Sequence, residues 1–600
     1  MYILGISCYY HDSAAALLHD GQLVAAAEEE RFSRIKHDHS FPTLAIEFCL
    51  KTAGISSEEV DYVVFYEKPL LKFERILQTT LQTFPKSWAV FRESMIAWFN
   101  EKLWVKSELL TKLNVPDDRI LFVEHHLSHA ASAFFCSPYD EAALLTIDGV
   151  GEWTTTGIGR GQSVWESRDN TFSSNQLVLE EEVRFPHSLG LLYSAFTAFL
   201  GFRVNNGEYK VMGMSPYGEP NRMDDVYKLI NVSDEGSFRL NMDYFAFHHS
   251  TTTTYSPKFI DLFGTPRIHD AEFYTPTTNP DKDYPGWNDR TAQVNQQYAD
   301  IAASVQRVTE DIVMKMARHA HERTGSKNLC IAGGVGLNSV ANGRLLREGP
   351  FENVYIQPAA GDGGGALGAA LYAYHVLLGK PRKFVMENAY WGQSYGPDEI
   401  TAAIDASGYS YEYVGDMEQV ASLMVDDLLA QKVISLFQDR FEWGPRALGN
   451  RSIMADPRAA AMKGVVNERI KFREPFRPFA PAVLESRANE FWQDLGDADS
   501  TYPYRYMLAV CRTKAEQEER IQAVSHMGSG RIQTVRPEWN PLYYRAIELF
   551  GEATGVPILL NTSFNLRGEP MVTTPENALA TFHTSGLDTL YMDGFVIRKP

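Results

Sequence analysis

One strand-and-loop pattern occurs twice in the N-terminal half of the chain, and it limits the possible folds more than any other feature. An apolar stretch at 2–7, a polar loop, a second apolar stretch at 14–18 and a tight turn into 22–27 predict three strands. A similar arrangement returns at 142–158, where an apolar strand ends in Asp148 before a β-like pattern resumes. The sequence therefore predicts an internally duplicated N-terminal half.

A helix, a strand and a glycine turn follow in order in the middle of the chain. Apolar residues recur at helical spacing between 301 and 316, and the apolar stretch 328–331 runs into a turn at 333–338. This alternation favours an α/β fold that binds its ligands at loops beyond the strand ends. The stretch 251–289, rich in Thr, Pro and Asp, is expected to form an insertion or a lid.

A chain of 600 residues exceeds one ordinary hydrophobic core, so several domains are expected. A boundary is expected near 379–382, after a helix of small residues and before a new βα pattern. We predict one domain over 1–380 and a second over 381–600, with the last residues able to pack back on the first domain.

Charge and cysteine content exclude several classes of protein. A formal net charge of −20 argues against a general basic surface for nucleic acid. Five widely spaced cysteines without a CxxC pair indicate neither a disulfide framework nor a thiolate zinc site. No basic region precedes an apolar stretch at the N-terminus, and no apolar run reaches the length of a membrane span. We expect a cytoplasmic protein that binds neither nucleic acid nor membrane.

Two histidines, His125 and His129, lie four residues apart, so on a helix both imidazoles project from one face and can share a metal. By themselves they fit equally well as packing residues beside Phe122 and Phe134. Two strand-end or turn carboxylates, Asp148 and Asp362, are the expected further ligands. Two His and two Asp suit a transition metal better than calcium or magnesium.

Two glycine turns, one at Gly333 and Gly334 and one that includes Gly361 and Gly363, allow close approach of the backbone to a nucleotide. A helix that starts after the second turn would offer N–H groups to phosphate. Either turn alone is equally compatible with a purely structural role.

Basic residues are concentrated in the C-terminal part of this acidic chain: Arg440, Arg446, Arg451, Lys471, Arg473, Arg477, Arg531 and Arg567. Arginine binds phosphate with two hydrogen bonds and lysine supplies a point charge, so the set predicts a site for a small anion. The alternative is a network of structural ion pairs with Glu442, Glu468 and Glu474. A strand end at 561–565 offers the hydroxyl and amide of Ser563 and Asn565 to a polar ligand, although such a terminus is often only a turn.

Taken together, the motifs resemble those of the carbamoyltransferases of antibiotic, nodulation-factor and related natural-product pathways, over nearly the whole chain. The segments that carry the resemblance are 11–15, 29–32 with 36–37, 125–129, 207–213, 333–338, 444–452, 472–481 and 561–570. It implies a duplicated actin and sugar-kinase-like N-terminal domain, similar to threonylcarbamoyl-transferring enzymes. The implied C-terminal α/β domain is similar to enzymes that make carbamoyl-type adenylates.

The resemblance also implies the chemistry. Carbamoyl phosphate and ATP with Mg²⁺ would form carbamoyl adenylate in the C-terminal domain, and a hydroxyl of a small natural product would then attack its carbonyl carbon in the N-terminal domain. His125, His129, Asp148 and Asp362 would hold a metal, with Fe²⁺ the expected ion. His11 or Asp12 would accept the proton of the acceptor, and Lys36 would help to hold that site.

The remaining implied contacts concern the nucleotide and carbamoyl phosphate. Gly333, Gly334, Asn338, Gly361 and Gly363 would lie at the nucleotide of the first domain. In the second domain the residues expected to bind phosphates or the carbamoyl amide are Arg446, Lys471, Arg477, Arg531, Ser563, Asn565 and Arg567.

Two positions depart from the family pattern, and two other functions stay open. Asp439 stands where a small glycine is usual, and Met527 where an acidic residue is common.

A carbamoyltransferase for a protein or tRNA acceptor is one alternative function, which the lack of zinc-binding cysteine pairs and of a basic surface disfavours. An actin-like ATP switch without group transfer is the other, and it leaves the basic residues without a role. The sequence does not specify the acceptor.

Overall fold

The computed structural model describes residues 1–100, 102–493, 495–496 and 502–599. The chain forms two compact units, and the division does not simply follow the order of the sequence. Unit 1 consists of Met1–Val24 and Leu50–Val385, and unit 2 of Ala25–Cys49 and Met386–Pro600.

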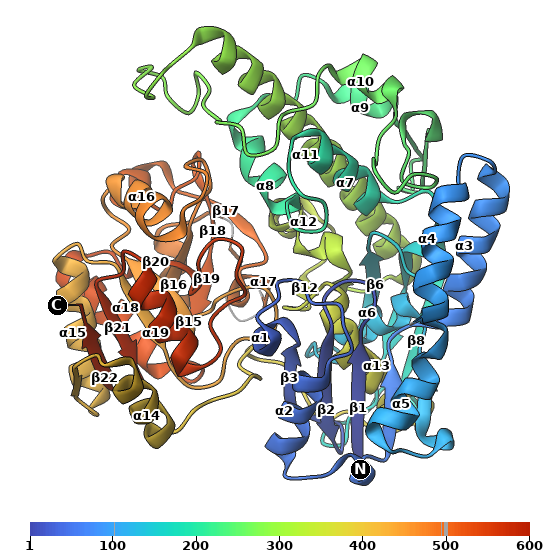
Figure 1. Cartoon of the computed structure of the whole chain (residues 1–600), viewed down its shortest axis with the longest axis horizontal. Coiled ribbons are helices and arrows are strands. Elements are labelled where there is room, and N and C mark those ends of the chain that lie inside the picture. Colours follow the sequence, from blue (N-terminus) through green and yellow to red (C-terminus); the bar gives the residue numbers. More distant parts are fainter. Residues whose placement is uncertain (101, 494, 497–501, 600) are drawn as a thin grey trace. The chain divides into compact units, whose positions relative to one another are not determined.

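Two five-stranded sheets form the framework of unit 1 (Figure 1). The first has the order β3 (Gln22–Glu28), β2 (Ala14–His19), β1 (Tyr2–Ser7), β4 (Tyr62–Phe65), β5 (Ile120–Phe122). The second has the order β8 (Gln176–Arg184), β7 (Thr154–Gln162), β6 (Glu141–Ile147), β11 (Asn328–Ala332), β12 (Asn353–Ile356). Both sheets therefore carry five strands with the same neighbours in the same positions.

The strand directions also match. In the first sheet β1 runs antiparallel to β2 and parallel to β4, which is parallel to β5. In the second sheet β6 runs antiparallel to β7 and parallel to β11, which is parallel to β12. The predicted duplication is therefore confirmed.

Two helices are packed between these sheets: α6 (His125–Phe134) and α13 (Asp362–Tyr372). Helix α13 contacts β1 and β2, α6 contacts β6 and β11, and the two helices contact each other (Figure 1). Their crossing is close because Gly368 has no side chain, and a Cβ there would lie 1.8 Å from the carbonyl oxygen of Ser128. Their N-termini bring the predicted metal ligands to the end of β6.

Other helices complete unit 1. The helical pattern at 301–316 lies inside a long helix, α11 (Asp289–Thr324), and β11 follows it as the sequence predicts. Helices α3 (Pro69–Thr83) and α4 (Trp88–Asn100) form a hairpin after β4. The stretch 251–289 contains α10 (Pro257–Phe263) and is otherwise irregular, and its role as a lid stays a prediction.

Unit 2 is built on an eight-stranded mixed sheet. Its order is β13 (Tyr411–Tyr413), β22 (Phe595–Arg598), β21 (Thr589–Met592), β14 (Ile434–Phe437), β15 (Arg451–Ala455), β20 (Ile558–Ser563), β16 (Ala480–Leu484), β19 (Gln533–Val535). Helices α15 (Met417–Leu429) and α18 (Pro541–Thr554) pack together on it through Met424, Ile547 and Phe550. The predicted α/β class is confirmed in both units.

The segment Ala25–Cys49 is held in unit 2 by buried charges on either side of α1 (Glu30–Ser33). Glu28 accepts the backbone N–H of Gly444 at 2.8 Å, and the Arg31 guanidinium donates to the carbonyl oxygen of the same residue at 2.6 Å. Thr573 in turn donates its hydroxyl hydrogen to the Arg31 carbonyl oxygen at 2.5 Å. This segment belongs structurally with residues that lie several hundred positions later in the chain.

All five cysteines are buried free thiols, as expected of a chain without a disulfide framework. Among the helices of the described ranges, none combines the length and the apolar character that crossing a bilayer requires.

Candidate metal centre and basic cluster

Four side chains converge where the ends of α6, β6 and α13 meet: His125, His129, Asp148 and Asp362. All four are buried, and one ligand atom from each lies within 4.8 Å of the others. The two Nε2 atoms of the histidines are 3.1 Å apart, and the Asp148 Oδ2 atom lies 3.2 Å from that of His125. The Asp362 Oδ1 atom lies 3.7 Å from both Nε2 atoms.

These separations fit a metal ion. Donor atoms that each lie about 2.0–2.2 Å from one ion are about 3–4 Å from each other. The Oδ2 atom of Asp362 is buried and has no hydrogen-bond partner within the described ranges, so the protein itself leaves this carboxylate incompletely satisfied. Two imidazoles with two carboxylates form a donor set typical of a transition metal.

The electrostatics of the cluster favour a cation. Burial lowers the pKa of His125, but its hydrogen bond with Asp148 and the charge of Asp362 outweigh burial and raise the pKa to about 9. Burial acts to raise the pKa of Asp148. The hydrogen bond from His125 and the charge of His129 outweigh burial, so the pKa of Asp148 lies well below its usual value. Each group stabilises the charged form of the other, and a metal ion would replace the proton in that arrangement.

Backbone groups fix the ligands in place. The Oδ1 atom of Asp148 accepts the N–H of Gly334 at 2.8 Å. Gly333 has a φ of +94°, and a Cβ there would lie 2.3 Å from the Ile147 carbonyl oxygen, so this turn requires glycine. Glu152 accepts the backbone N–H of His125 at 3.0 Å and thereby caps the first turn of α6. In this structure the Gly333–Gly334 turn serves the metal ligand directly.

The other residues predicted at the nucleotide of unit 1 lie at helix starts. Asn338 caps the helix α12 (Ser339–Glu348), its Oδ1 atom accepting the N–H of Ala341 at 3.1 Å. Gly361 precedes α13, and Gly363 is buried in the first turn of that helix. Their contact with a nucleotide stays a prediction.

His11 and Asp12 lie in the loop between β1 and β2. The Nδ1 atom of His11 lies 2.9 Å from the Asp12 carboxylate, and its Nε2 atom 2.9 Å from the carbonyl oxygen of Asn205. Both neighbours are acceptors, so both ring nitrogens carry hydrogen. Burial lowers the pKa of His11, but Asp12 outweighs it and raises the pKa to about 9. In this arrangement His11 is a cation that donates, and Asp12 is the group of the pair that can accept a proton.

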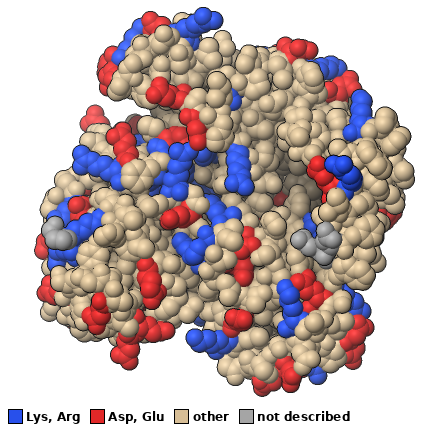
Figure 2. Space-filling model, viewed as in Figure 1, with Lys and Arg blue, Asp and Glu red and all other residues tan. Residues whose placement is uncertain are grey.

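Unit 2 contains a basic cluster formed by Lys36, Arg446, Lys471, Arg473, Arg477 and Arg531. Burial, followed by the charges of Arg446 and Arg477, lowers the pKa of Arg531 well below its usual value. No ion pair joins Arg531 to a carboxylate within the part of the chain that the structure describes. Figure 2 shows Lys and Arg side chains gathered on unit 2 around α16 (Ala461–Val465). A bound anion would stabilise cations placed in this way, and the anion site stays a prediction.

Lys471 is hydrogen-bonded to two residues at the end of β20, and its contact with phosphate stays a prediction. Its Nζ atom donates to the Ser563 carbonyl oxygen at 2.7 Å and to the carbonyl and side-chain oxygens of Asn565 at 2.9 and 2.6 Å. The Ser563 hydroxyl donates to the same Asn565 side chain at 2.7 Å. The three residues therefore form one connected group beneath the cluster, and Arg567 lies exposed just beyond it.

A buried glutamate shapes the loop that carries Arg446. The Oε1 atom of Glu442 accepts the backbone N–H groups of Leu448, Asn450 and Arg451 at 2.7, 2.9 and 3.1 Å. Glu442 therefore holds this loop through backbone groups. The sequence alone suggests an ion pair for Glu442, because the backbone N–H groups that donate to it are brought together only in the folded loop.

Lys36 lies in unit 2, where its charge contributes to the lowered pKa of Lys471. Its predicted role in holding the site of His11 and Asp12 stays a prediction.

The two departures from the family pattern fall on unusual backbone conformations. Asp439 has a φ of +43° and Met527 a φ of +51°, both in the left-handed region. Glycine is favoured there, which explains its usual presence at the position of Asp439. Aspartate tolerates this region because its short polar side chain bonds locally.

Comparisons with known proteins place these sites in a family. The model of the carbamoyltransferase N-terminus matches residues 2–371, and that of the carbamoyltransferase C-terminus matches residues 425–599. The protein sll1178 of Synechocystis is 46% identical over 100% of this chain and 97% of its own length. The nodulation protein NolNO of Sinorhizobium fredii is 36% identical over 98% of this chain and 79% of its own length.

Among solved structures, the alignment with the ROK hexokinase of Thermus thermophilus covers 62% of this chain and 98% of the hexokinase chain. The sequence identity is 12% and the TM-score is 0.25. The two domain models account for most of the chain, and the motifs at both sites lie within the matched ranges. The chain therefore belongs to the carbamoyltransferase family and is a carbamoyltransferase enzyme.

Proposed function

We propose that this enzyme is an ATP-dependent O-carbamoyltransferase that works in two steps. Unit 2 would make carbamoyl adenylate from carbamoyl phosphate and ATP with Mg²⁺, and unit 1 would transfer the carbamoyl group to a hydroxyl of a small natural product. The observation that carries the proposal is the basic cluster of unit 2, in which Arg531 is paired with no carboxylate among the described residues.

The first step has a definite balance. Carbamoyl phosphate takes up water and releases inorganic phosphate, and an oxygen of the resulting carbamate attacks the α-phosphorus of ATP while pyrophosphate leaves. Apart from water, every species in this step is an anion, so mutual repulsion must be offset before reaction. Arg446, Arg477 and Arg531 would offset it, since arginine forms paired hydrogen bonds to phosphate. The Lys471, Ser563 and Asn565 group would hold the floor of the site in shape.

In the second step the acceptor oxygen bonds to the carbonyl carbon of the adenylate, the bond to AMP breaks and AMP leaves. An alcohol needs to lose its proton as it attacks. Asp12 would take that proton, and His11 would hold Asp12 in place through their hydrogen bond. A transition metal held by His125, His129, Asp148 and Asp362, with Fe²⁺ the expected ion, would supply a Lewis acid for the carbonyl.

The acceptor class is part of the proposal. A protein or tRNA acceptor is the alternative within the same chemistry, and a net charge of −20 argues against a polyanionic one. A switch without group transfer does not account for a separate basic cluster in unit 2.

The test is incubation of the purified enzyme with ATP, Mg²⁺, carbamoyl phosphate and a panel of hydroxylated natural products. Mass spectrometry follows the gain of a carbamoyl group, and parallel assays follow pyrophosphate and AMP. We expect all three products. Release of ADP, or no turnover of ATP, would reject the two-step proposal.

A variant separates the two steps. Asp148→Ala should lose bound metal and carbamoyl transfer while it still releases pyrophosphate from ATP and carbamoyl phosphate. Asp169→Ala, an exposed aspartate of the same unit, is the matched control and should keep both activities. Full transfer by a metal-free Asp148→Ala enzyme would contradict the metal assignment.

A further inference from the structure

The hairpin of α3 and α4, with the short helix η2 (Lys102–Trp104) after it, has a large exposed apolar surface in unit 1 (Figure 1). Four aromatic side chains of this region are each more than half exposed: Phe84, Trp88, Phe99 and Trp104. An aromatic side chain buries about 150–250 Å² when it is covered, so these four offer roughly 350–600 Å². Three aliphatic side chains are exposed to a similar degree: Leu70, Leu81 and Ile96. The total approaches the roughly 800 Å² that each partner contributes to a stable interface.

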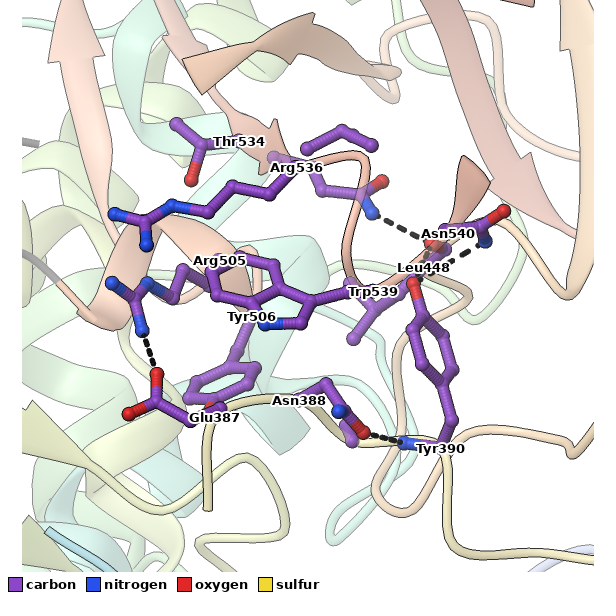
Figure 3. Close-up of a pocket in the computed structure, with 13 residues that line it drawn as sticks. Glu387, Asn388, Tyr390, Leu448, Arg505, Tyr506, Thr534, Arg536, Trp539 and Asn540 are labelled. Atoms are coloured by element: carbon purple, nitrogen blue, oxygen red, sulfur yellow. Dashed lines mark hydrogen bonds and ion pairs between the residues drawn. The ribbon is translucent and has the colours of Figure 1, made fainter. Parts of the chain in front are cut away.

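The tryptophans show how far this surface departs from the rest of the molecule. The chain has ten tryptophans, all within the described ranges, and only Trp88 and Trp104 are exposed. Trp539 of unit 2 is largely covered by its neighbours: Figure 3 shows Arg505 and Arg536 beside it, and their guanidinium groups lie 4.5 and 4.9 Å from its ring centroid. Aromatic side chains are enriched where proteins bind one another. Two exposed tryptophans in one short stretch therefore indicate a surface that a partner covers.

Helix α4 is apolar on two sides. On the inner side Trp98 is 2% exposed and packs edge-on against Phe73 of α3, with ring centroids 5.4 Å apart. On the outer side Trp88, Ile96 and Phe99 are exposed, and the helical repeat places all three on one face. A helix that is apolar all round is normally enclosed by protein. The outer face of α4 is therefore expected to bind a partner.

The charged residues of α4 indicate which partner fits. Arg92 and Glu93 are adjacent, exposed and near the middle of the helix, and they are its only charged residues. In a twofold dimer one surface meets itself, so each contact between two different residues occurs twice. When two copies of α4 lie antiparallel about an axis beside this pair, Arg92 of each copy faces Glu93 of the other. Because the charges of the face cancel, two copies do not repel each other, and the face has no excess charge to attract an anionic lipid surface.

The apolar residues fit the same antiparallel register. It places Ala89 opposite Ile96 and Ala97 opposite Trp88, in each case a small side chain opposite a large one. All four residues are exposed. Alternation of small and large side chains lets facing helices pack closely and without voids. Charge and size therefore match in one register, as a surface that binds its own copy requires.

We infer that the outer face of α4 is a dimer interface, at which a second copy of this chain packs antiparallel, α4 against α4, with Arg92 opposite Glu93. The area, the exposed tryptophans and the self-complementary register all point to the same partner. The inference does not depend on the proposed function, because none of these residues belongs to the metal centre or the basic cluster.

The test is the molar mass of the purified full chain at about micromolar concentration, measured by sedimentation equilibrium. We expect twice the mass of one chain. Ile96→Glu introduces a charge at the centre of the interface, opposite Ala89, and should weaken dimerisation about tenfold or more. Lys51→Glu, at an exposed residue of the same unit outside the hairpin, is the matched control and should stay dimeric.

The charged pair allows a sharper test of the register. Arg92→Glu or Glu93→Arg alone brings like charges together twice, so each should weaken the dimer roughly tenfold. Both substitutions in one chain should restore the wild-type affinity. A mixture of the two single variants should form mixed dimers, because every contact then joins opposite charges. All these positions are exposed, so the variants should fold, which circular dichroism checks.

A monomeric wild-type chain would overturn the inference, and flotation of that monomer with phosphatidylglycerol vesicles would assign the surface to lipid instead. A dimer that Ile96→Glu leaves intact would overturn it as well, because a different surface would then join the copies. Failure of the paired exchange to restore the affinity lost in the single variants would reject the antiparallel register. These measurements need no substrate, so they stand or fall separately from the assays of carbamoyl transfer.

Discussion

At the scale of single residues, the neighbours of each side chain decide its protonation and its role. His11 illustrates this, because both of its ring nitrogens face oxygen acceptors and its positive charge is held by Asp12. Glu442 illustrates the same point for a carboxylate, because its Oε1 atom accepts three backbone N–H groups. Neither role follows from the residue type alone.

The His11 pair predicts a pH-dependent stability. The pKa of His11 is raised to about 9 in the folded chain, above its ordinary value of 6.5. The charged pair therefore contributes fully to the stability of the folded chain below about pH 6.5, and this contribution is lost as the pH rises through about 9. His11→Gln should lower the melting temperature by a few degrees at about pH 6 and by less at about pH 10. His269→Gln, at an exposed histidine, should show no such trend. A constant difference across this range would contradict the assignment of the charged form.

Glu442 predicts a large loss on truncation. Glu442→Ala leaves three buried N–H groups without their acceptor and should cost at least about 3 kcal/mol of unfolding free energy, measured by urea denaturation. Pyrophosphate release should fall as well, since the same loop carries Arg446. Glu516→Ala, at an exposed glutamate of the same unit, should change neither quantity. Wild-type stability of Glu442→Ala would show that the loop does not depend on this carboxylate.

At the scale of elements, the metal centre depends on how closely two helices cross. Asp362 begins α13 and His125 begins α6, so the distance between the helices sets the distance between the ligands. The duplicated sheets place one helix against each sheet and leave the helix starts at the end of β6. The distances between the four candidate ligands therefore depend on how these two helices pack.

Gly368→Ala tests this dependence. The added methyl group would meet the Ser128 carbonyl oxygen, so the helices must separate and the ligands with them. We expect at least a tenfold loss of metal affinity in competition with a chelator, and a lower melting temperature. Gly464→Ala is the control, because a Cβ there meets nothing within 4 Å. Wild-type metal affinity in Gly368→Ala would mean that the crossing does not position the ligands.

The sequence predicted the convergence of the four candidate metal ligands better than it predicted the contacts of the other site residues. His125 and His129 are four residues apart on a helix, and Asp148 ends an apolar strand, so local rules place them correctly. Strand ranges such as Tyr2–Ser7 and the glycine turn before α13 were predictable for the same local reason. The contacts of Glu442 with the loop after it, and of Arg31 with Gly444, arise only in the fold, and no local rule predicts them.

At the scale of the whole molecule, the main departure from sequence order is the segment Ala25–Cys49. Its links to unit 2 join Arg31 to Gly444, 413 positions away, and to Thr573, 542 positions away. Such pairings have no periodicity or spacing that a single sequence reveals. A domain boundary predicted near residue 380 therefore places residues 25–49 in the first domain, whereas their contacts group them with unit 2.

A fragment test follows. Residues 386–600 alone should melt at a lower temperature than a fusion of residues 25–49 to 386–600, because the isolated fragment lacks Glu28 and Arg31 at the loop that carries Arg446. Circular dichroism against temperature measures the difference. A fusion with Arg31→Met should lose most of the gain, and equal melting of all three proteins would contradict the structural role of the segment.

The long separation between Arg31 and Gly444 also has a consequence for synthesis on the ribosome. At about 5–20 residues per second, the chain between them takes roughly 20–80 s to make. During that interval the buried face of residues 25–49 has been synthesised and its binding partner has not. The nascent enzyme thus spends many seconds with Arg31 and its apolar neighbours not yet covered by the residues around Gly444.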